Sequence, residues 1–346
     1  MIENYILSII IINYNNTIEN ICNCIESVIE ATGNNQQIEI ICVDDGSTNE
    51  SVNMLRSYEK NTKNLYLYEK QNGGPSSARN YGMQYANGDW IWFIDGDDNI
   101  CKDSVGHLLQ IVSEYNEYDV VYFAHNDIIE NQITNNKMGI DERFIQLPVE
   151  NKLSYEGALL LNPSDYRKYP FLLGAVWDAI YKKERLVTEK INFDEELVRG
   201  EDALFNLNVI RHSCKIGYYD EALYNYVIHQ GSICNDYKSD IKIYLNLISA
   251  AYSFCKNSDV EIFNHYKYFC SNYIFEILKL HFFHKKNNNG IMNKRKEFIE
   301  ILKKDEIKIA FKGGCKNYTK WSLKLKYYLV KYKMFYLLKF FYKLAY

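Results

Sequence analysis

Short apolar runs alternate with amphipathic stretches over the first hundred residues. The runs at 6–12, 38–43, 65–68 and 90–94 have strand length, and the stretches at 17–30, 49–60 and 76–86 carry apolar residues near helical spacing. Parallel strands need crossover helices between them, and parallel sheets are covered on both faces. The pattern therefore predicts an α/β fold with a mostly parallel, Rossmann-like sheet flanked by helices.

The pattern loosens beyond Asp103. It predicts strands at 120–124, 216–219 and 223–228, and helices at 153–161 and 202–212. From residue 238 almost to the end the chain is helical in pattern, with breaks at 287–290 and 313–314. We therefore expect two parts: an α/β domain over residues 1–235 and a helical, basic and aromatic region over residues 236–346.

Charge is divided unequally between these two parts. The whole chain has a formal net charge of −4, but from Lys285 onward 17 Lys and Arg side chains stand against four Asp and Glu, a net charge of +13. Such an asymmetry indicates an anionic partner for the C-terminal region. Lysines alternate with aromatic residues and Leu over 327–343, as in segments that lie in the interface of an anionic membrane. The alternative is a helical subdomain whose aromatic side chains pack on the α/β domain. Nucleic acid is not expected as a partner, because no recognition fold accompanies the charge.

Targeting signals and cysteine spacing suggest the cell compartment. The nine cysteines are scattered without metal-ligand spacing, which favours reduced, mostly buried thiols. The N-terminus does not have the pattern of a signal peptide, and no uncharged apolar stretch is long enough to span a bilayer. We expect a cytoplasmic protein, held peripherally at the inner face of the cytoplasmic membrane if the basic region binds lipid.

Two acidic turns follow predicted strands, at 44–47 (Asp-Asp-Gly-Ser) and at 95–98 (Asp-Gly-Asp-Asp). In an open α/β sheet the ligand crevice lies at the carboxyl ends of the strands, so both turns should border one pocket. Carboxylates suit a hard cation such as Mg²⁺ or Mn²⁺, which completes its shell with substrate phosphates and water. The second turn thus predicts a metal site that holds a diphosphate, with a solvated acidic turn as the alternative.

Five motifs in order resemble glycosyltransferase family 2, whose enzymes have the GT-A fold, over about residues 5–235. They stand at 8–15, 43–48, 72–82, 95–98 and 200–205. Two departures are Ile12, where the family often has Pro, and Val227, where it often has Arg. The resemblance implies a metal-dependent, inverting transferase that uses Mn²⁺ or Mg²⁺. Its donor would be a nucleotide-sugar, in the first place a UDP-sugar, and its acceptor a saccharide or lipid-linked sugar of bacterial surface polysaccharide assembly.

The resemblance also implies a set of residues that bind the nucleotide-sugar: Tyr14, Asn15, Asp45, Gly74, Arg79, Asp95, Gly96 and Trp177. Asp45 can accept a hydrogen bond from the uracil N–H, or else cap the following helix. Arg79 can neutralise the diphosphate or be a surface cation, and Trp177 can face a sugar or fill the core.

Metal binding and base catalysis fall, by the same resemblance, on four residues. Asp97 is the expected metal ligand, and His229 is a second candidate whose alternative is a structural role. Asp202 is the expected base, which takes the proton from the acceptor hydroxyl, with Glu201 as its partner. The alternative for this acidic pair is charge matching at a helix N-terminus.

Two other functions remain open at this point. A nucleotidyltransferase would also hold a diphosphate over an α/β sheet, but residues 13–16 (Asn-Tyr-Asn-Asn) are not the glycine-rich, lysine-containing loop that would favour it. An inactive, membrane-associated carbohydrate-binding protein is the second alternative, and the intact Asp97 and Asp202 argue against it.

Overall fold

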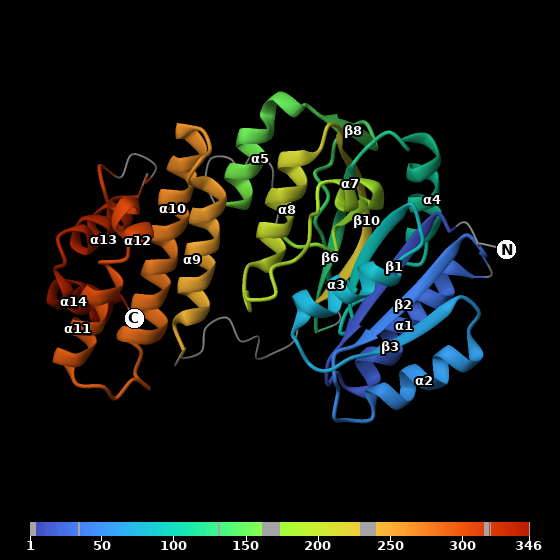
Figure 1. Ribbon diagram of the computed structural model, residues 1–346, viewed down its shortest axis with the longest axis horizontal. Coiled ribbons are helices and arrows are strands. Elements are labelled where there is room, and N and C mark those ends of the chain that lie inside the picture. The colour runs from blue at the N-terminus through green and yellow to red at the C-terminus, as the bar shows by residue number, and fades with distance from the viewer. Residues whose placement is uncertain are drawn as a thin grey trace. The chain divides into compact units, whose positions relative to one another are not determined.

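The computed structural model describes residues 5–33, 35–130, 132–160, 174–228, 240–314, 318 and 320–345, and the side chains of these residues up to 343. The chain divides into two compact units. The first comprises residues 1–155 and 169–230, and the second residues 156–168 and 231–346. The first unit is an α/β domain and the second is helical (Figure 1).

A ten-stranded sheet forms the centre of the first unit, in the order β3-β2-β1-β4-β9-β6-β10-β5, with β7 on β6 and β8 on β10. β3, β2, β1 and β4 are parallel, as are β6 and β10, whereas β9 runs antiparallel between these two blocks. The expectation of a mostly parallel sheet is thereby confirmed. The described strands are β1 (Leu7–Asn13), β2 (Ile38–Asp44), β3 (Leu65–Glu69), β4 (Trp90–Asp95), β5 (Asn99–Ile100), β6 (Val120–Ile129), β7 (Gln132–Asn135), β8 (Phe144–Leu147), β9 (Ala179–Lys182) and β10 (Ile216–Val227).

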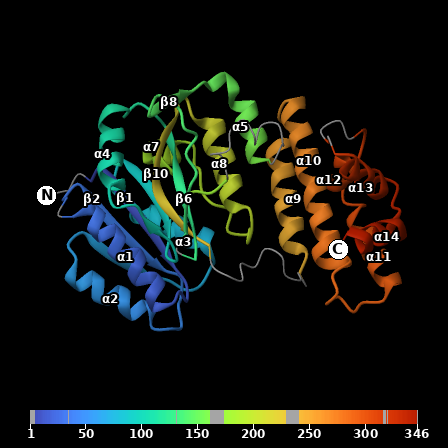
Figure 2. The same ribbon diagram turned by 180° about the vertical axis from the view of Figure 1, so that it is seen from behind.

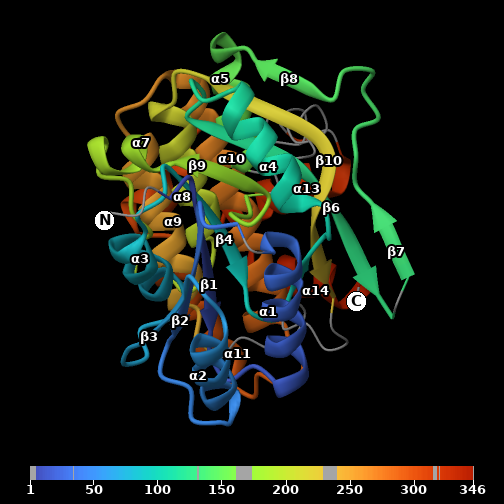
Figure 3. The same cartoon turned by 90° about the vertical axis from the view of Figure 1, so that its right-hand side faces the viewer.

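Helices cover both faces of this sheet (Figure 3). On one face, α1, α2 and α4 bury a cluster that includes Ile9 and Trp92 of the central strands. On the other, α8 packs Phe205 against Phe93, with ring centroids 5.9 Å apart, and α3 approaches Ile10 closely at Gly82. The alternation of side chains along a strand explains why neighbouring residues serve opposite faces. The helices of this unit are α1 (Ile18–Thr32), α2 (Ser51–Asn61), α3 (Pro75–Tyr85), α4 (Ser104–Glu114), α7 (Lys183–Thr188) and α8 (Glu201–His212), with a 3₁₀ turn, η1 (Val149–Asn151). The residues of α5 (Lys152–Leu159) are divided between the two units.

Strand register brings the two acidic turns together. Ile12 of β1 pairs with Asp95 of β4, and Asn13 pairs with Asp44 of β2. All three strands are parallel, so their carboxyl ends share one edge, as the sequence predicted.

One expectation for the second half of this domain is wrong. The two short strands predicted at 216–219 and 223–228 are a single strand, β10, whose register against β6 shifts between Tyr219 and Tyr224. Asp220 lies in this interruption, and its carboxylate accepts hydrogen bonds from the backbone N–H groups of Met138, Gly139 and Ile140. The charged residue therefore marks a bulge that binds a neighbouring loop and does not end the strand. The sequence pattern also does not predict α4 or β9.

The described part of the second unit consists mainly of helices (Figure 2). α9 (Lys242–Cys255) and α10 (Val260–Ile277) lie side by side, and α10 continues into a π-helical turn, η3 (Leu278–Phe282). Aromatic rings fill its core, among them Phe282, Phe298 and Phe335, whose centroids lie 5.3–6.1 Å apart. None of the helices in the described part of the chain has the length and apolar character needed to cross a bilayer. The remaining helices are α11 (Ile291–Ile301), α12 (Asp305–Ala310), α13 (Trp321–Lys331) and α14 (Phe335–Ala345).

Candidate functional site

A cavity of about 500 Å³ opens at the carboxyl ends of β1 and β4. It brings together nine of the twelve residues that the sequence selected: Tyr14, Asp45, Gly74, Arg79, Asp95, Gly96, Asp97, Glu201 and Asp202. Asn15 and Trp177 do not line it, and His229 lies outside the described residues. Residues from both acidic turns, from α3 and from the start of α8 thus converge, although they are up to about 190 positions apart in the sequence.

Arg79 is the central cation of this cavity. It comes from α3, its side chain is only 4% exposed, and its guanidinium donates to Asp202 Oδ1 at 2.7 Å and to Asp95 Oδ1 at 2.8 Å. Glu201 Oε1 lies 3.7 Å from the same Nη1 that binds Asp202. One planar guanidinium therefore connects the turn after β4 with the N-terminus of α8.

Burial and charge shift the pKa values of both partners. Burial lowers the pKa of Arg79, but Asp202, Asp95 and Glu201 outweigh it, so the net shift is upward. Burial raises the pKa of Asp202 to about 8, with Arg79 opposing and Glu201 and Asp95 adding to the rise. A carboxyl group with such a pKa can exchange a proton near neutral pH, which is what a general base requires.

The turn after β4 separates an exposed carboxylate from a buried one. Asp97 is exposed and lines the cavity, whereas Asp98 is 3% exposed. Asp98 accepts hydrogen bonds from the Tyr224 hydroxyl and from the Val227 N–H, both at 2.7 Å. The same hydroxyl accepts a bond of 3.3 Å from the Asp95 N–H. Burial, followed by the charge of Asp95, raises the pKa of Asp98 to about 8. Asp98 and Tyr224 therefore fix this turn against the end of β10.

Asp45 is held by the loop that precedes α3. Its carboxylate accepts from Lys70 Nζ at 2.6 Å, from Asn72 Nδ2 at 3.1 Å and from the N–H groups of Gly73 and Gly74 at 3.0 and 2.7 Å. The alternative role as a helix cap is not found, because the residue at the N-cap of α2 is Glu50. The contact between Asp45 and a nucleobase stays a prediction, and in the observed arrangement the carboxylate organises the 70–74 loop.

Asn13 and Asn15 brace the turn after β1. Asn13 Nδ2 donates to Asp44 and to Ser51 at 2.7 and 2.9 Å, and Asn15 Oδ1 accepts from the Thr48 N–H at 2.8 Å. Asn15 has a φ of +52°, a conformation that Asn tolerates better than most residues. Asn15 thus connects the turn after β1 with the turn after β2, while Tyr14, 52% exposed, lines the cavity.

Two glycines let backbone approach the cavity. Gly74 has a φ of +86° at the N-cap of α3. A Cβ on Gly96 would lie 2.6 Å from the Ile12 carbonyl oxygen and 2.7 Å from Asn16 Nδ2. A larger residue would therefore push the turn after β4 away from the turn after β1.

Trp177 lies in the core cluster of the first unit. Its ring stacks on Tyr224 and Tyr226 with centroid separations of 4.5 and 5.4 Å, and it is 7% exposed. This position matches the core alternative, and a contact between Trp177 and a sugar stays a prediction.

The residues of the cavity suit a divalent cation only in part. In the described residues no cluster of three or more His, Cys, Asp and Glu side chains is arranged to hold a metal. Yet five carboxyl groups and one guanidinium line the cavity, a balance that would repel a diphosphate unless a cation entered with it. The oxygen donors of Asp97 and Asp95 are of the type that Mg²⁺ and Mn²⁺ prefer. These two residues fit such an ion if donor phosphates and water supply the remaining ligands.

Several residues that shape the site are not among the candidates selected from the sequence. Lys70 and Asn72 hold Asp45, and Tyr224 holds Asp98. Polar residues directly after or at the end of apolar strands are the signal that identifies Asn13 and Lys70, but the Tyr224 contact spans 126 positions and has no local signature.

Comparisons with known proteins agree with this geometry. Residues 8–163 match the family model described as Glycosyl transferase family 2. The minor teichoic acid biosynthesis protein GgaB of Bacillus subtilis is 33% identical over 235 residues, which cover 66% of this chain and 23% of GgaB. The glycosyltransferase GlyA of Streptococcus pneumoniae is 30% identical over 61% of this chain and 29% of its own length. The chain thus spans under a third of the length of these two relatives.

A solved structure has the same fold. The crystal structure of Staphylococcus aureus TarS residues 1–349 in complex with UDP-GlcNAc aligns with a TM-score of 0.67, at 19% identity, over 98% of this chain and 90% of that one. The match includes the parallel sheet and the C-terminal helices. Together with the family match and the order of the motifs, this confirms the resemblance seen in the sequence: residues 8–163 match glycosyltransferase family 2, and the protein has the GT-A fold.

Proposed function

We propose that the protein transfers a sugar from a UDP-sugar to a saccharide or lipid-linked acceptor in bacterial cell-wall or surface polysaccharide assembly. The observation that carries this proposal is the Arg79 cluster, in which a carboxyl group of raised pKa and an acidic turn face one cavity. The complex of TarS with UDP-GlcNAc supports the donor class, and the similarity to GgaB, a minor teichoic acid biosynthesis protein, supports the acceptor class.

In the proposed reaction the acceptor hydroxyl attacks the anomeric carbon, and the bond from that carbon to the diphosphate oxygen breaks. Asp202 takes the proton of the attacking hydroxyl. Arg79 keeps Asp202 oriented through its 2.7 Å hydrogen bond and contributes positive charge beside the departing diphosphate. Attack from the side opposite the leaving group inverts the anomeric centre.

Asp97, with Asp95 beside it, would hold a Mg²⁺ or Mn²⁺ ion, and His229 remains a candidate ligand. When bound, such an ion neutralises charge on the leaving nucleoside diphosphate. The excess of carboxyl groups around the cavity supports this requirement. Asp98 and Tyr224 set the position of the turn that carries both ligands.

We also propose that the basic C-terminal helices associate with the anionic inner surface of the cytoplasmic membrane, where lipid-linked acceptors are found. The net charge of +13 beyond Lys285 supports this placement. The exposed side chains of Tyr336, Leu337 and Phe340 on α14 supply apolar contacts.

A donor screen tests the central proposal. The purified protein is incubated with Mn²⁺ and single UDP-, GDP- and dTDP-sugars, and release of the nucleoside diphosphate is followed with and without EDTA. We expect slow release from one or two UDP-sugars, abolished by EDTA. Pyrophosphate release from a sugar 1-phosphate and UTP would instead support a nucleotidyltransferase.

A matched pair of variants tests whether Asp97 binds the metal. Asp97→Asn should abolish the metal-dependent release, whereas Asp103→Asn should not, because Asp103 is an exposed carboxylate six positions away that does not line the cavity. If no donor is cleaved and no nucleotide-sugar raises the melting temperature in the presence of metal, the transferase proposal fails and the carbohydrate-binding alternative gains support.

A further inference from the structure

A second cavity, of about 650 Å³, lies entirely within the helical unit, and lysines surround it. It is lined by Lys279, Lys285, Lys294, Lys339 and Lys343, together with His284 and a floor of apolar side chains. None of the described residues that line it is acidic. This volume is within the range of small-molecule sites, about 300–1,000 Å³.

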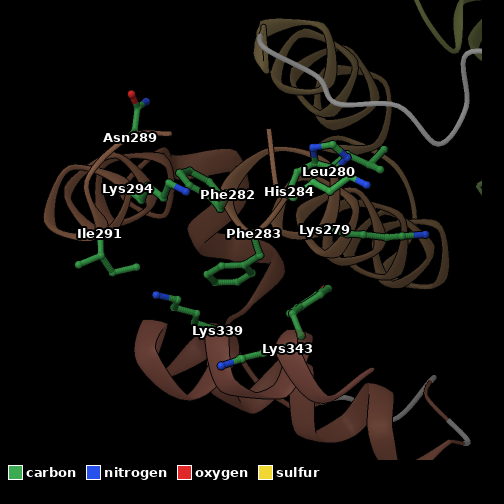
Figure 4. Close-up of a pocket in the computed structure, with 12 residues that line it drawn as sticks. Lys279, Leu280, Phe282, Phe283, His284, Asn289, Ile291, Lys294, Lys339 and Lys343 are labelled. Atoms are coloured by element: carbon green, nitrogen blue, oxygen red, sulfur yellow. The ribbon is translucent and has the colours of Figure 1, made fainter. Parts of the chain in front are cut away.

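Lys294 of α11 and the lysines Lys339 and Lys343 of α14 line this cavity, and Lys294 Nζ also donates to the Asn287 carbonyl at 2.8 Å. Figure 4 shows Phe283 between Lys294 of α11 and the pair Lys339 and Lys343 of α14. Burial lowers the pKa of Lys294, and the nearby charge of Lys339 lowers it further. In the described part of the chain no carboxylate forms an ion pair with Lys339 or Lys343, although Lys303 of the same unit pairs with Glu300 at 2.7 Å. An anion in this cavity would relieve a repulsion that the fold leaves in place.

Apolar side chains of the cavity pack on the aromatic core of the helical unit. The ring of Phe283 lies 5.2 Å from Phe335 and 5.4 Å from Tyr342, and the Tyr342 hydroxyl donates to the Phe275 carbonyl at 2.9 Å. A purely polar anion such as free phosphate would gain nothing from these rings. A phosphate joined to an apolar chain would match both halves of the lining.

The surface beside the cavity has the same dual character. On α14, Tyr336 and Phe340 are 52% and 61% exposed, and they lie at helical spacing next to Lys339 and Lys343. Lysines that border an exposed aromatic face are typical of helices that lie in a membrane interface.

We infer that the cavity between α11 and α14 is a binding site for the phosphate group of an anionic amphiphile, with Lys294, Lys339 and Lys343 as its cationic ligands. This inference deepens the membrane part of the proposed function, on which it rests. Its readout is binding and not turnover, so its failure would leave the transferase proposal untouched.

Co-sedimentation of the full chain with vesicles tests the site. One sample contains phosphatidylcholine vesicles with phosphatidylglycerol, and a second contains phosphatidylcholine vesicles alone. A third sample contains the phosphatidylglycerol vesicles together with soluble glycerol phosphate as a competitor. We expect binding only in the presence of phosphatidylglycerol, and we expect the double variant Lys339→Gln/Lys343→Gln to weaken it roughly tenfold to thirtyfold.

A control of equal charge separates a site from general attraction. Lys296→Gln/Lys324→Gln removes the same charge from exposed lysines of α11 and α13 that line no part of the cavity, and it should change the affinity less than about twofold. Circular dichroism and the melting temperature verify that both double variants fold. Competition by millimolar glycerol phosphate would show that the phosphate group alone is recognised, and lack of competition that the lipid chain is needed; either result supports the site. Equal loss in both double variants, or no binding to phosphatidylglycerol, would overturn it.

Discussion

Loss of Arg79 should destabilise the first unit strongly, because Arg79 is a buried cation with three carboxyl partners. Replacing it by Met keeps most of the side-chain volume and removes the charge. Asp202 and Asp95 would then lose hydrogen bonds of 2.7 and 2.8 Å, and Glu201 its neighbour at 3.7 Å. Removing one partner of a buried ion pair costs about 3–5 kcal/mol, mostly from the unpaired charge left behind.

The exposure of the carboxylates places the expected loss at the lower end of that range. The side chains of Asp202 and Asp95 are 22% and 27% exposed, so water compensates part of the lost interaction. We therefore expect Arg79→Met to lower the free energy of unfolding by about 3 kcal/mol at pH 8. In a unit of this size that corresponds to a fall of about 6–12 °C in melting temperature. Arg79→Lys, which keeps the charge but not the planar fork, should cost about half as much.

Urea unfolding followed by tryptophan fluorescence measures this loss in the relevant unit. Trp90, Trp92 and Trp177 are buried there, whereas Trp321 of the helical unit is 73% exposed and contributes little change. Without Arg79 the pKa of Asp202 should rise above its value of about 8, so the folded variant holds more protons than the folded parent. The difference in stability must therefore shrink as the pH falls from 8 to 5.5. A loss that is the same at both pH values, or smaller than about 1 kcal/mol, would refute the assignment of Arg79 as a buried charge partner.

Three further predictions concern the chemistry and the turns. We expect kcat/KM to rise with pH through about 8, because Asp202 must be ionised in the free protein before it can accept a proton. The variant Asp202→Asn should lose turnover but still bind the nucleotide-sugar, as calorimetry would measure. Tyr224→Phe removes the hydroxyl between Asp98 and Asp95 and should lower the free energy of unfolding by about 1–3 kcal/mol. It should also raise KM for the donor, which steady-state kinetics at several Mn²⁺ concentrations would measure. Asp45→Asn leaves Lys70 without its charge partner, so limited proteolysis should cut the 70–74 loop faster than in the parent, and an unchanged rate would speak against its organising role.

The first hundred residues could be predicted well because each element has its own local signal. β1, β2 and β4 are continuous apolar runs, and α3 begins at Pro75 directly after Gly74. Parallel topology then follows from the alternation of strand and helix, and the meeting of the two acidic turns follows from parallel topology. The general rules for parallel sheets are therefore enough to predict that Asp45 and Asp97 border one cavity.

Residues that act across the fold could not be predicted in the same way. Tyr224 contacts Asp98 because β10 pairs with β6 in a particular register. No sequence pattern near residue 224 specifies the register of this pairing. The antiparallel β9 is only four residues long and is determined by pairing with β4 and β6. Trp177 has an aromatic signature that fits a sugar contact and a core position equally well, and only packing on Tyr224 separates them.

The polar network of the site links elements that must act on different parts of a donor and an acceptor. A hydrogen-bonded path leads from Val227 at the end of β10 through Asp98 and Tyr224 to the Asp95 backbone. From the Asp95 carboxylate it continues through Arg79 to Asp202 at the start of α8. A cation beside Asp95 and Asp97 would compete with Arg79 for the Asp95 carboxylate. The guanidinium N–H groups that Asp95 released could then interact with the diphosphate and more strongly with Asp202. Because Arg79 lowers the pKa of Asp202, the same event would favour the ionised base. On this argument donor and metal together prepare the base, so the pH dependence of donor-saturated turnover should lie at lower pH than that of kcat/KM.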